Sequence, residues 1–424
     1  MIVASIIFLG LLFIGFPVAF AMGLSGVLGL VYIGGISPLG FPQRAFMALN
    51  SFPFLAIPLF ILSGALFNAG GITRRIVKFC SVVLRSWRGS LGHANIMTSY
   101  VMTGFTGSAT ADAVACSSLL IPVMVEDGYS PEFSAGVTAA SATIGAIHPP
   151  SISLVLYGSI TGLSIGTLFM TGIVPTILIV LGLMLVVVYY GYKLQWKKGT
   201  RPQFKEVWAA IKDAIWALIA PIIVLGGILA GLYTATEAAI IAVVYALFLG
   251  LFVYKEFTVK DLPRICYTAA QNTAVPCTII SLAGLFGLVL TRENFGYYVI
   301  NFFTAITPNP DILFLVIILM ILIVSTCVDG TVIMFIFIPL LHPLAIQLGY
   351  NPFHFGMIMV ITIMLGSITP PVGMQLYIAA SFAKVTITRV LIWPFAGMML
   401  AIIILLTYVP NLVLFIPRLL GMIE

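Results

Sequence analysis

The sequence predicts an all-α membrane protein that crosses the bilayer several times. Of its 424 residues, 61% are hydrophobic and only 8% are charged, and no water-soluble fold could bury that much apolar surface. Apolar segments long enough to cross a bilayer as a helix recur along the chain, the clearest at 173–190, 214–232, 238–254 and 390–409. An internal repeat divides the chain into two related halves.

The first segment, 2–34, is apolar from its start. It has no basic region before it and is too long for the apolar core of a signal peptide. We expect it to remain in the protein as a membrane anchor.

The basic residues gather in loops between the apolar segments. One loop carries Lys193, Lys197, Lys198, Arg201, Lys205 and Lys212, and another carries Lys255, Lys260 and Arg264. Two spans separate these loops, so both lie on one side of the membrane, and the positive-inside rule assigns that side to the cytoplasm. The net charge of +6 thus reflects membrane topology, and no nucleic-acid partner is expected.

The repeat is recognised from two sets of motifs. Residues 128–131 (GYSP) match 349–352 (GYNP) at an offset of 349 − 128 = 221, and the same offset carries 145–150 (GAIHPP) onto 366–371 (GSITPP). Upstream, 108–112 (SATAD) matches 325–329 (STCVD) at 329 − 112 = 217. The difference corresponds to a short insertion in the second half.

The two copies are predicted to have opposite topology. From the loop charges, 88–127 begins and ends in the cytoplasm, whereas 309–350 begins and ends outside. Such inverted repeats are typical of transporters. Each segment has polar residues in its middle, so we expect two re-entrant helical hairpins with tips at 107–112 and 325–330. The stretches 72–89 and 292–306 before them are predicted to be interfacial arm helices.

Two Pro-Pro pairs predict broken helices. In 144–151 and 365–373, a glycine, a polar residue and Pro-Pro interrupt apolar helices, because proline lacks an amide hydrogen and clashes with the preceding turn. Freed carbonyls and half-helix ends inside a membrane bind ions and anionic groups. The matched breaks therefore indicate a transport site, although each could be a simple kink.

The hairpin tips carry two intramembrane acids, Asp112 and Asp329. Burying a carboxylate in lipid costs at least about 2.5 kcal/mol, so each needs a cation, a hydrogen-bond donor or water. We interpret them as support for a cation site; the alternative is a structural hydrogen bond at the tip. Nearby hydroxyls at Ser108, Thr110, Ser325 and Thr326 offer oxygen ligands for a hard cation such as sodium, and Gly145 and Gly366 allow close backbone approach.

Two basic side chains have alternative interpretations. The guanidinium of Arg292 could bind a substrate carboxylate, or it could anchor a helix end at the interface beside Glu293. His148 lies in the first break, where the second has Thr369. It could sense protons or act as a ligand, or form a hydrogen bond at a helix end.

Several enzyme classes lack their motifs here. There is no G-x-x-x-x-G-K-[ST] loop for ATP hydrolysis, no G-x-S-x-G elbow and no H-E-x-x-H helix. The five cysteines have no C-x-x-C spacing, which indicates small buried residues. We therefore expect a transporter and not an enzyme.

The GSATAD tip at 107–112, the two Pro-Pro breaks and the GYxP hairpin exits together resemble the large membrane subunit of tripartite ATP-independent periplasmic (TRAP) transporters, including the sialic acid type. The resemblance implies an elevator architecture of the ion transporter superfamily in the bacterial inner membrane. It implies import of an organic acid, such as sialic acid or a C4-dicarboxylate, driven by two or more sodium ions. It also implies a small four-helix membrane subunit and a periplasmic substrate-binding protein as partners.

Carried over by position, the resemblance also implies functional residues. The sodium sites would involve Ser108, Thr110, Asp112, Gly145, His148, Ser325, Thr326, Asp329, Gly366, Thr369 and Met374. The substrate would contact Ser108, Ser153 and Arg292.

The same comparison implies four parts of the chain. Scaffold helices and the first arm occupy 1–88, and one half of the transport domain occupies 89–195. The cytoplasmic loop, further scaffold helices and the second arm occupy 196–308, and the other transport half occupies 309–424.

Two other functions fit parts of the pattern. A stand-alone sodium:carboxylate symporter would share the architecture without needing a binding protein. An intramembrane aspartyl protease would use two aspartates as a catalytic pair, but neither aspartate here lies in the Gly-x-Gly-Asp context of those enzymes.

Asp329→Asn should weaken sodium-dependent uptake without preventing membrane insertion, because it removes a charge from the predicted cation site and keeps the side-chain shape. Uptake measured against sodium concentration checks this. An unchanged sodium dependence would remove Asp329 from the site.

Overall fold

The computed structural model describes residues 2–34, 37–307 and 309–423, and within these ranges the chain forms helices and no strand. Seven of these helices are long and apolar enough to cross a membrane, or eight spans if the bent pair Trp393–Tyr408 and Pro410–Leu419 is counted as one. The predicted all-α, multi-pass fold is therefore confirmed. The predicted domain boundary at residue 308 lies outside the described residues.

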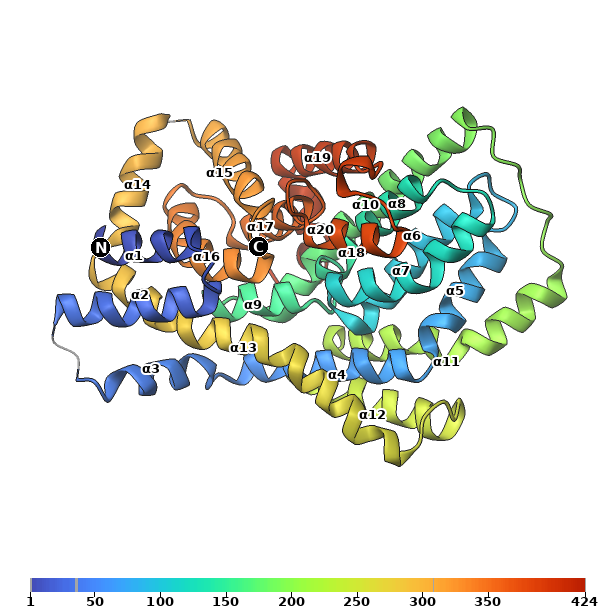
Figure 1. Cartoon of the computed structure of the whole chain (residues 1–424), viewed down its shortest axis with the longest axis horizontal. Helices are drawn as coiled ribbons and strands as arrows, with labels where there is room; N and C mark the ends of the chain where they lie inside the picture. The colour runs from blue at the N-terminus through green and yellow to red at the C-terminus, as the bar shows by residue number, and fades with distance from the viewer. Residues whose placement is uncertain (1, 35–36, 308, 424) are drawn as a thin grey trace.

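One group of helices forms a long slab along one side of the molecule (Figure 1). It contains α1 (Ile2–Phe13), α2 (Val18–Ile33), α3 (Gly40–Leu49), η1 (Phe52–Leu55), α4 (Ala56–Ala69), α11 (Phe204–Leu229), α12 (Ala235–Phe248) with the π-turn η3 (Leu249–Val253), η4 (Val259–Asp261) and α13 (Leu262–Arg292). α13 packs against α2, α3 and α4, and α12 packs against α4 and α11. These are the segments predicted to be scaffold.

Each sequence repeat forms a hairpin followed by an interrupted helix. The first has α6 (Ser90–Thr106), α7 (Ala109–Glu126), α8 (Pro131–Ala142), η2 (Thr143–Ala146) and α9 (Ile152–Thr161). The second has α15 (Pro310–Ser325), α16 (Gly330–Gln347), α17 (Pro352–Gly366), α18 (Met374–Ala383) and η5 (Ile387–Arg389). The turns that connect the two helices of each hairpin therefore lie at the predicted tips, and the helices are interrupted at both Pro-Pro pairs.

The remaining helices flank the repeats. α5 (Ile72–Val83) and α14 (Phe295–Ile306) precede the two hairpins, where the arms are predicted; α10 (Ile165–Lys193), α19 (Trp393–Tyr408) and α20 (Pro410–Leu419) follow the interrupted helices. α10 packs against α19, α20 and α17. The orientation of α5 and α14 to the bilayer stays a prediction.

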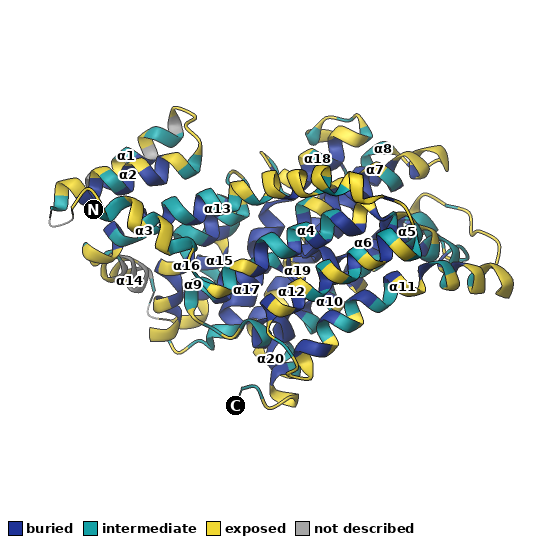
Figure 2. Cartoon of the chain, turned by 90° about the horizontal axis from the view of Figure 1, so that it is seen from below, coloured by how far each residue is buried: buried dark blue, intermediate teal, exposed yellow. Residues whose placement is uncertain are grey.

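The central helices of the two halves are buried on all sides. Every residue is buried from Phe133 to Ala142 in α8 and from His354 to Gly366 in α17, and Figure 2 shows α17 within the dark interior. A helix that is apolar all round belongs inside a protein. The break that follows α8 is likewise buried throughout, whereas the break that follows α17 has Pro371 and Val372 exposed.

The two halves are interlocked at the second parts of these helices. α9 of the first half packs against α16 of the second hairpin, and α18 of the second half packs against α7 and α8 of the first. Each half thus completes the packing of the other.

The tips of the hairpins are bonded to the breaks by their main chains. The carbonyl of Gly107 accepts a hydrogen bond from the amide of Ile152 at 3.0 Å, and the carbonyl of Thr326 accepts one from the amide of Val372 at 3.1 Å. Glycine allows this close approach: a Cβ added at Gly366 would lie 1.8 Å from Oγ of Ser325.

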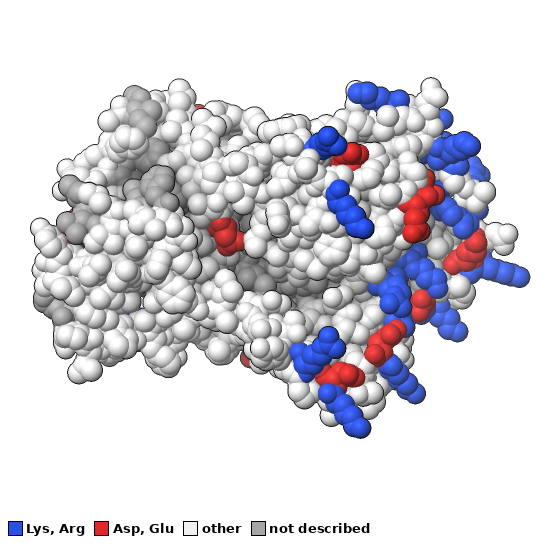
Figure 3. Space-filling view, viewed as in Figure 1, with Lys and Arg blue, Asp and Glu red and all other residues white. Residues whose placement is uncertain are grey.

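Most of the charged residues seen in Figure 3 gather at one end of the molecule, around α5, α11 and the loop after α10. Arg75 of α5 pairs with Asp213 at 3.3 Å and with Glu256 at 2.8 Å, and Arg85 pairs with Glu206 at 2.5 Å. These contacts join segments that lie far apart in sequence. Through these pairs Arg75 and Arg85 contact both basic loops of the sequence, so the two loops lie at the same end of the molecule.

Gly366→Ala should lower the thermal stability of the protein, because its methyl group would collide with Ser325 and separate the tip from the break. We expect a loss of about 1–3 kcal/mol, typical of overpacked interiors, measured by thermal unfolding in detergent. Gly397→Ala in α19 is the matched control, since a Cβ there meets nothing within 4 Å. Equal unfolding midpoints for both variants would contradict the packing described here.

Candidate functional site

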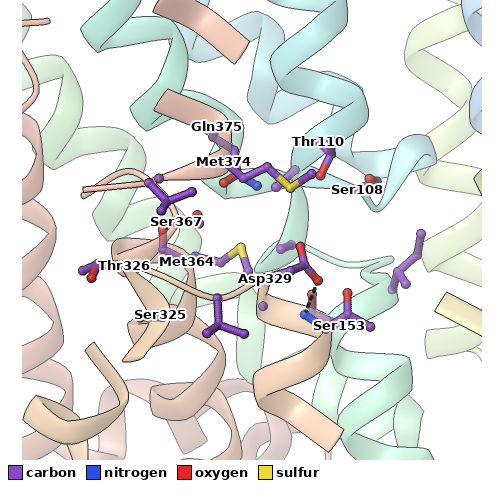
Figure 4. A pocket seen from close by; sticks show the side chains of 18 of the residues that line it. Ser108, Thr110, Ser153, Ser325, Thr326, Asp329, Met364, Ser367, Met374 and Gln375 are labelled. Carbon is purple, nitrogen blue, oxygen red and sulfur yellow. Dashed lines mark hydrogen bonds between the residues drawn. The ribbon is translucent and has the colours of Figure 1, made fainter. Parts of the chain in front are cut away.

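A cavity of about 330 Å³ lies between the two hairpin tips and the two helix breaks. Its walls come from residues 107–110 of the first tip, 325–331 of the second, and the segments that enter α9 and α18. Figure 4 shows side chains from both halves around the same space. The cavity is therefore located where the repeated motifs converge.

Equivalent positions of the repeat face each other across the cavity. Ser108 and Ser325 are related by the offset 325 − 108 = 217, and Ser153 and Met374 by 374 − 153 = 221; all four line the cavity. Ala146 and Ser367 are a further such pair. Repeat-related positions therefore line the cavity in pairs, but several pairs carry side chains of different chemistry.

The two repeat-related aspartates occupy different environments. Asp329 precedes α16 and lines the cavity, where its Oδ1 accepts a hydrogen bond from the amide of Thr331 at 2.9 Å. Asp112 lies within the first turn of α7 and is fully buried. The reason is local: α7 begins directly after Ser108, whose hydroxyl accepts from the amide of Ala111, whereas α16 begins only after Asp329.

Asp112 is directed away from the cavity, toward the first break. Its Oδ1 accepts a hydrogen bond from the Thr106 hydroxyl at 2.6 Å, and its Oδ2 has no partner among the described residues. A Cβ added at Gly145 would lie 2.6 Å from that Oδ2. A buried carboxylate oxygen without a partner is costly, so this corner is suited to a cation.

The structure gathers seven of the sequence-predicted site residues at the cavity wall: Ser108, Thr110, Ser153, Ser325, Thr326, Asp329 and Met374. Asp112, Gly145 and Gly366 lie behind the wall, in the contacts between tips and breaks. The roles of these residues in binding sodium or substrate stay predictions.

Three predicted residues lie away from the cavity wall. Arg292 ends α13, is exposed, and its Nη1 donates to the carbonyl of Gly34 at 3.3 Å. His148 packs its ring on Tyr100, with centroids 4.8 Å apart. The hydroxyl of Thr369 donates to the carbonyl of Leu365 at 2.7 Å. Arg292 and Thr369 thus form hydrogen bonds near helix ends, whereas the buried Nδ1 of His148 has no hydrogen-bond partner among the described residues.

Sequence reasoning missed four polar residues of the cavity: Thr331, Ser367, Gln375 and Tyr377. The repeat offers a signal for two of them, because Ser367 and Tyr377 correspond to Ala146 and Leu156, which also line the cavity. Thr331 and Gln375 correspond to Val114 and Leu154, which are absent from the lining. The repeat therefore could not have indicated these two.

The cavity wall combines apolar side chains with hydroxyl and amide groups and carries a single formal charge. Of its lining residues, Asp329 is acidic and none is Lys, Arg or His. Within the part of the chain that the structure describes, no cluster of three His, Cys, Asp or Glu side chains could hold a metal ion. The available ligands are hydroxyls, carbonyls and one carboxylate, which suit a hard monovalent cation more than a transition metal.

Solved structures support the fold. The crystal structure of the Alcanivorax borkumensis YdaH transporter superposes with a TM-score of 0.54, covers 86% of each chain and is 14% identical in sequence. At this identity the likeness concerns the fold alone.

Relatives at higher identity cover nearly the whole chain. The sialic acid TRAP transporter large permease protein SiaM of Vibrio cholerae is 35% identical over 418 residues, which is 97% of each chain. The sialic acid TRAP transporter permease protein SiaT of Haemophilus influenzae is 33% identical over 420 residues. The match spans 68% of SiaT and 64% of the isethionate permease DctMQ of Oleidesulfovibrio alaskensis, which are longer proteins.

A family model extends over most of the sequence. Residues 5–412 match the model described as tripartite ATP-independent periplasmic transporter, DctM component. The match includes both hairpins, both broken helices and every residue of the cavity wall. The chain therefore belongs to the DctM family, the large permease component of TRAP transporters.

Proposed function

We propose that this chain imports an organic acid together with sodium ions across the bacterial inner membrane. A periplasmic binding protein delivers the acid, and a small four-helix membrane subunit completes the transporter. The single observation that carries the proposal is a cavity between the two sequence repeats whose wall offers hydroxyl and amide groups, one acidic side chain and no basic one.

The charge of the cavity gives the physical reason for coupling. An organic anion that enters it meets Asp329 and no Lys, Arg or His on the wall. Two negative charges held close together in one cavity repel each other. A bound cation removes this repulsion, so the anion and the cation bind more favourably together than either ion binds alone. This coupling is the thermodynamic basis of symport.

Two places could hold the cations. One lies at the first tip, near the free Oδ2 of Asp112 and the backbone of Gly145. The other lies at the second tip, where Asp329 and the hydroxyl of Thr326 line the cavity. Oxygen ligands from a hairpin tip and a broken helix match the way such transporters coordinate sodium.

An elevator movement fits the division of the helices. The interlocked hairpins and broken helices carry all the lining of the cavity. No residue of the slab lines the cavity. A block that contains the whole cavity can cross the membrane against a fixed slab, so the site faces one side and then the other.

Relatives support the substrate class and the partners. Permeases similar to this chain are named for sialic acid, C4-dicarboxylates and 2,3-diketo-L-gulonate, all of which are organic acids. Sialic acid permeases occur both at about the length of this chain and in a longer form of which it spans 68%. The longer form is consistent with a second component carried on one polypeptide.

Uptake into proteoliposomes tests the proposal. The complete transporter should accumulate labelled N-acetylneuraminate or succinate when the acid is presented on its binding protein under an inward sodium gradient. Choline in place of sodium should abolish uptake, because the acid would then enter without its compensating cation.

Other outcomes would exclude parts of the proposal. Uptake of the free acid without any binding protein would favour a stand-alone symporter. Uptake driven by a proton gradient in choline would exclude sodium as the coupling ion. Asp329→Asn provides the matched variant, since it alters the cavity and leaves the slab untouched.

A further inference from the structure

The side chain of Gln375 is buried at the cavity wall without a hydrogen-bond partner. The residue is 4% exposed, and its Oε1 makes no hydrogen bond within the described part of the chain. It lies in the first turn of α18 and lines the cavity between the tips (Figure 4). Since an unsatisfied buried amide costs about 1–3 kcal/mol, a bound ligand is the natural partner for this group.

The fold itself does not require an amide at this position. The repeat-related residue in the first half, at 375 − 221 = 154, is Leu154, which is fully buried. At the equivalent position, where the first broken helix resumes, an apolar leucine is therefore compatible with the fold. The polar residue occurs only on the side of the cavity that also carries Asp329.

Other polar groups of the wall are also uncommitted. The side-chain hydroxyls of Thr110, Ser153, Thr331 and Tyr377 line the cavity and form no hydrogen bond in the described structure. Asp329 uses Oδ1 for the amide of Thr331, which leaves Oδ2 available. In Figure 4, Thr110 and Gln375 lie in the upper part of the view and Asp329 and Ser153 in the lower part.

These groups differ in the hydrogen bonds that they can form with a ligand. A carboxylate only accepts hydrogen bonds, whereas a hydroxyl both donates and accepts, and an amide offers an acceptor and two donors. Asp329 can therefore bind a group that donates a hydrogen bond. The amide and the surrounding hydroxyls can bind a ligand that does both.

An unsubstituted dicarboxylate matches this wall poorly. At neutral pH it has acceptors only, and its second negative charge would need one more cation in a cavity without basic side chains. An acid with one carboxylate and several hydroxyls brings one charge and several donors, so it can satisfy Asp329 and Gln375 at the same time.

We propose that the cavity selects a polyhydroxylated acid with a single carboxylate, and that Gln375 and Asp329 recognise its hydroxyl groups. This inference rests on the proposed function of the cavity as an organic-acid site. It assigns to Gln375 the role of a specificity-determining residue.

Cysteines of the chain itself provide the test. Cys327 is exposed and lines the cavity, whereas Cys266 is exposed in α13 and is not part of the lining. The full chain in lipid nanodiscs with sodium is treated with a thiol-reactive reagent, and modification of each cysteine is followed by mass spectrometry. The acids added are D-gluconate, D-glucuronate and N-acetylneuraminate, with succinate and butyrate for comparison.

At least one hydroxylated acid should slow modification of Cys327 at a concentration about tenfold lower than succinate or butyrate, the ratio expected when a buried hydrogen bond is completed. Modification of Cys266 should not change. Gln375→Leu should abolish the advantage. Ser381→Ala, on the exposed side of the same helix, should keep it.

The outcomes separate this inference from the proposed function. Equal protection by succinate and the hydroxylated acids, or an advantage that survives in Gln375→Leu, would overturn the role of hydroxyl recognition and leave acid binding intact. Absence of protection by every acid, with and without sodium, would contradict both. Because the comparison of acids uses the unaltered chain, it remains decisive even if Gln375→Leu fails to fold.

Discussion

The structure depends on the contact between two hairpin tips and two interrupted helices inside the membrane protein. A broken helix leaves backbone groups without helical partners, and hydrocarbon cannot satisfy them. Here the carbonyls of Gly107 and Thr326 accept hydrogen bonds from Ile152 and Val372. The breaks are tolerated because each is bonded to a tip, and each tip is held in place because it is bonded to a break.

Much of this arrangement could be predicted from sequence because it follows from backbone chemistry. Pro-Pro within an apolar helix must interrupt it, and both interruptions occur where expected, after Ala142 and after Gly366. The glycine and serine residues of the tips and the basic residues of the loops can likewise be recognised from the sequence alone. Each of these signals is local, and repetition in the two halves distinguishes it from chance.

The details of the site could not be predicted because they depend on where helices begin. Asp112 and Asp329 are equivalent in sequence, yet one is buried behind the wall and the other lines the cavity, since α7 starts earlier in its repeat than α16. Gln375 and Thr331 have apolar counterparts, so symmetry gave no indication of them. Arg292 has chemistry suited to an anion but contacts Gly34 at the end of α13, away from the cavity.

The exchange of α9 and α18 between the halves has a consequence for biosynthesis. When the ribosome has produced only the first half, α7 and α8 lack the helix that later packs on them, and α9 lacks α16. Until the second half has been made, the polar groups at the first break need water or the insertion machinery as partners inside the membrane. Assembly of the first half therefore cannot be completed until α18 has been translated.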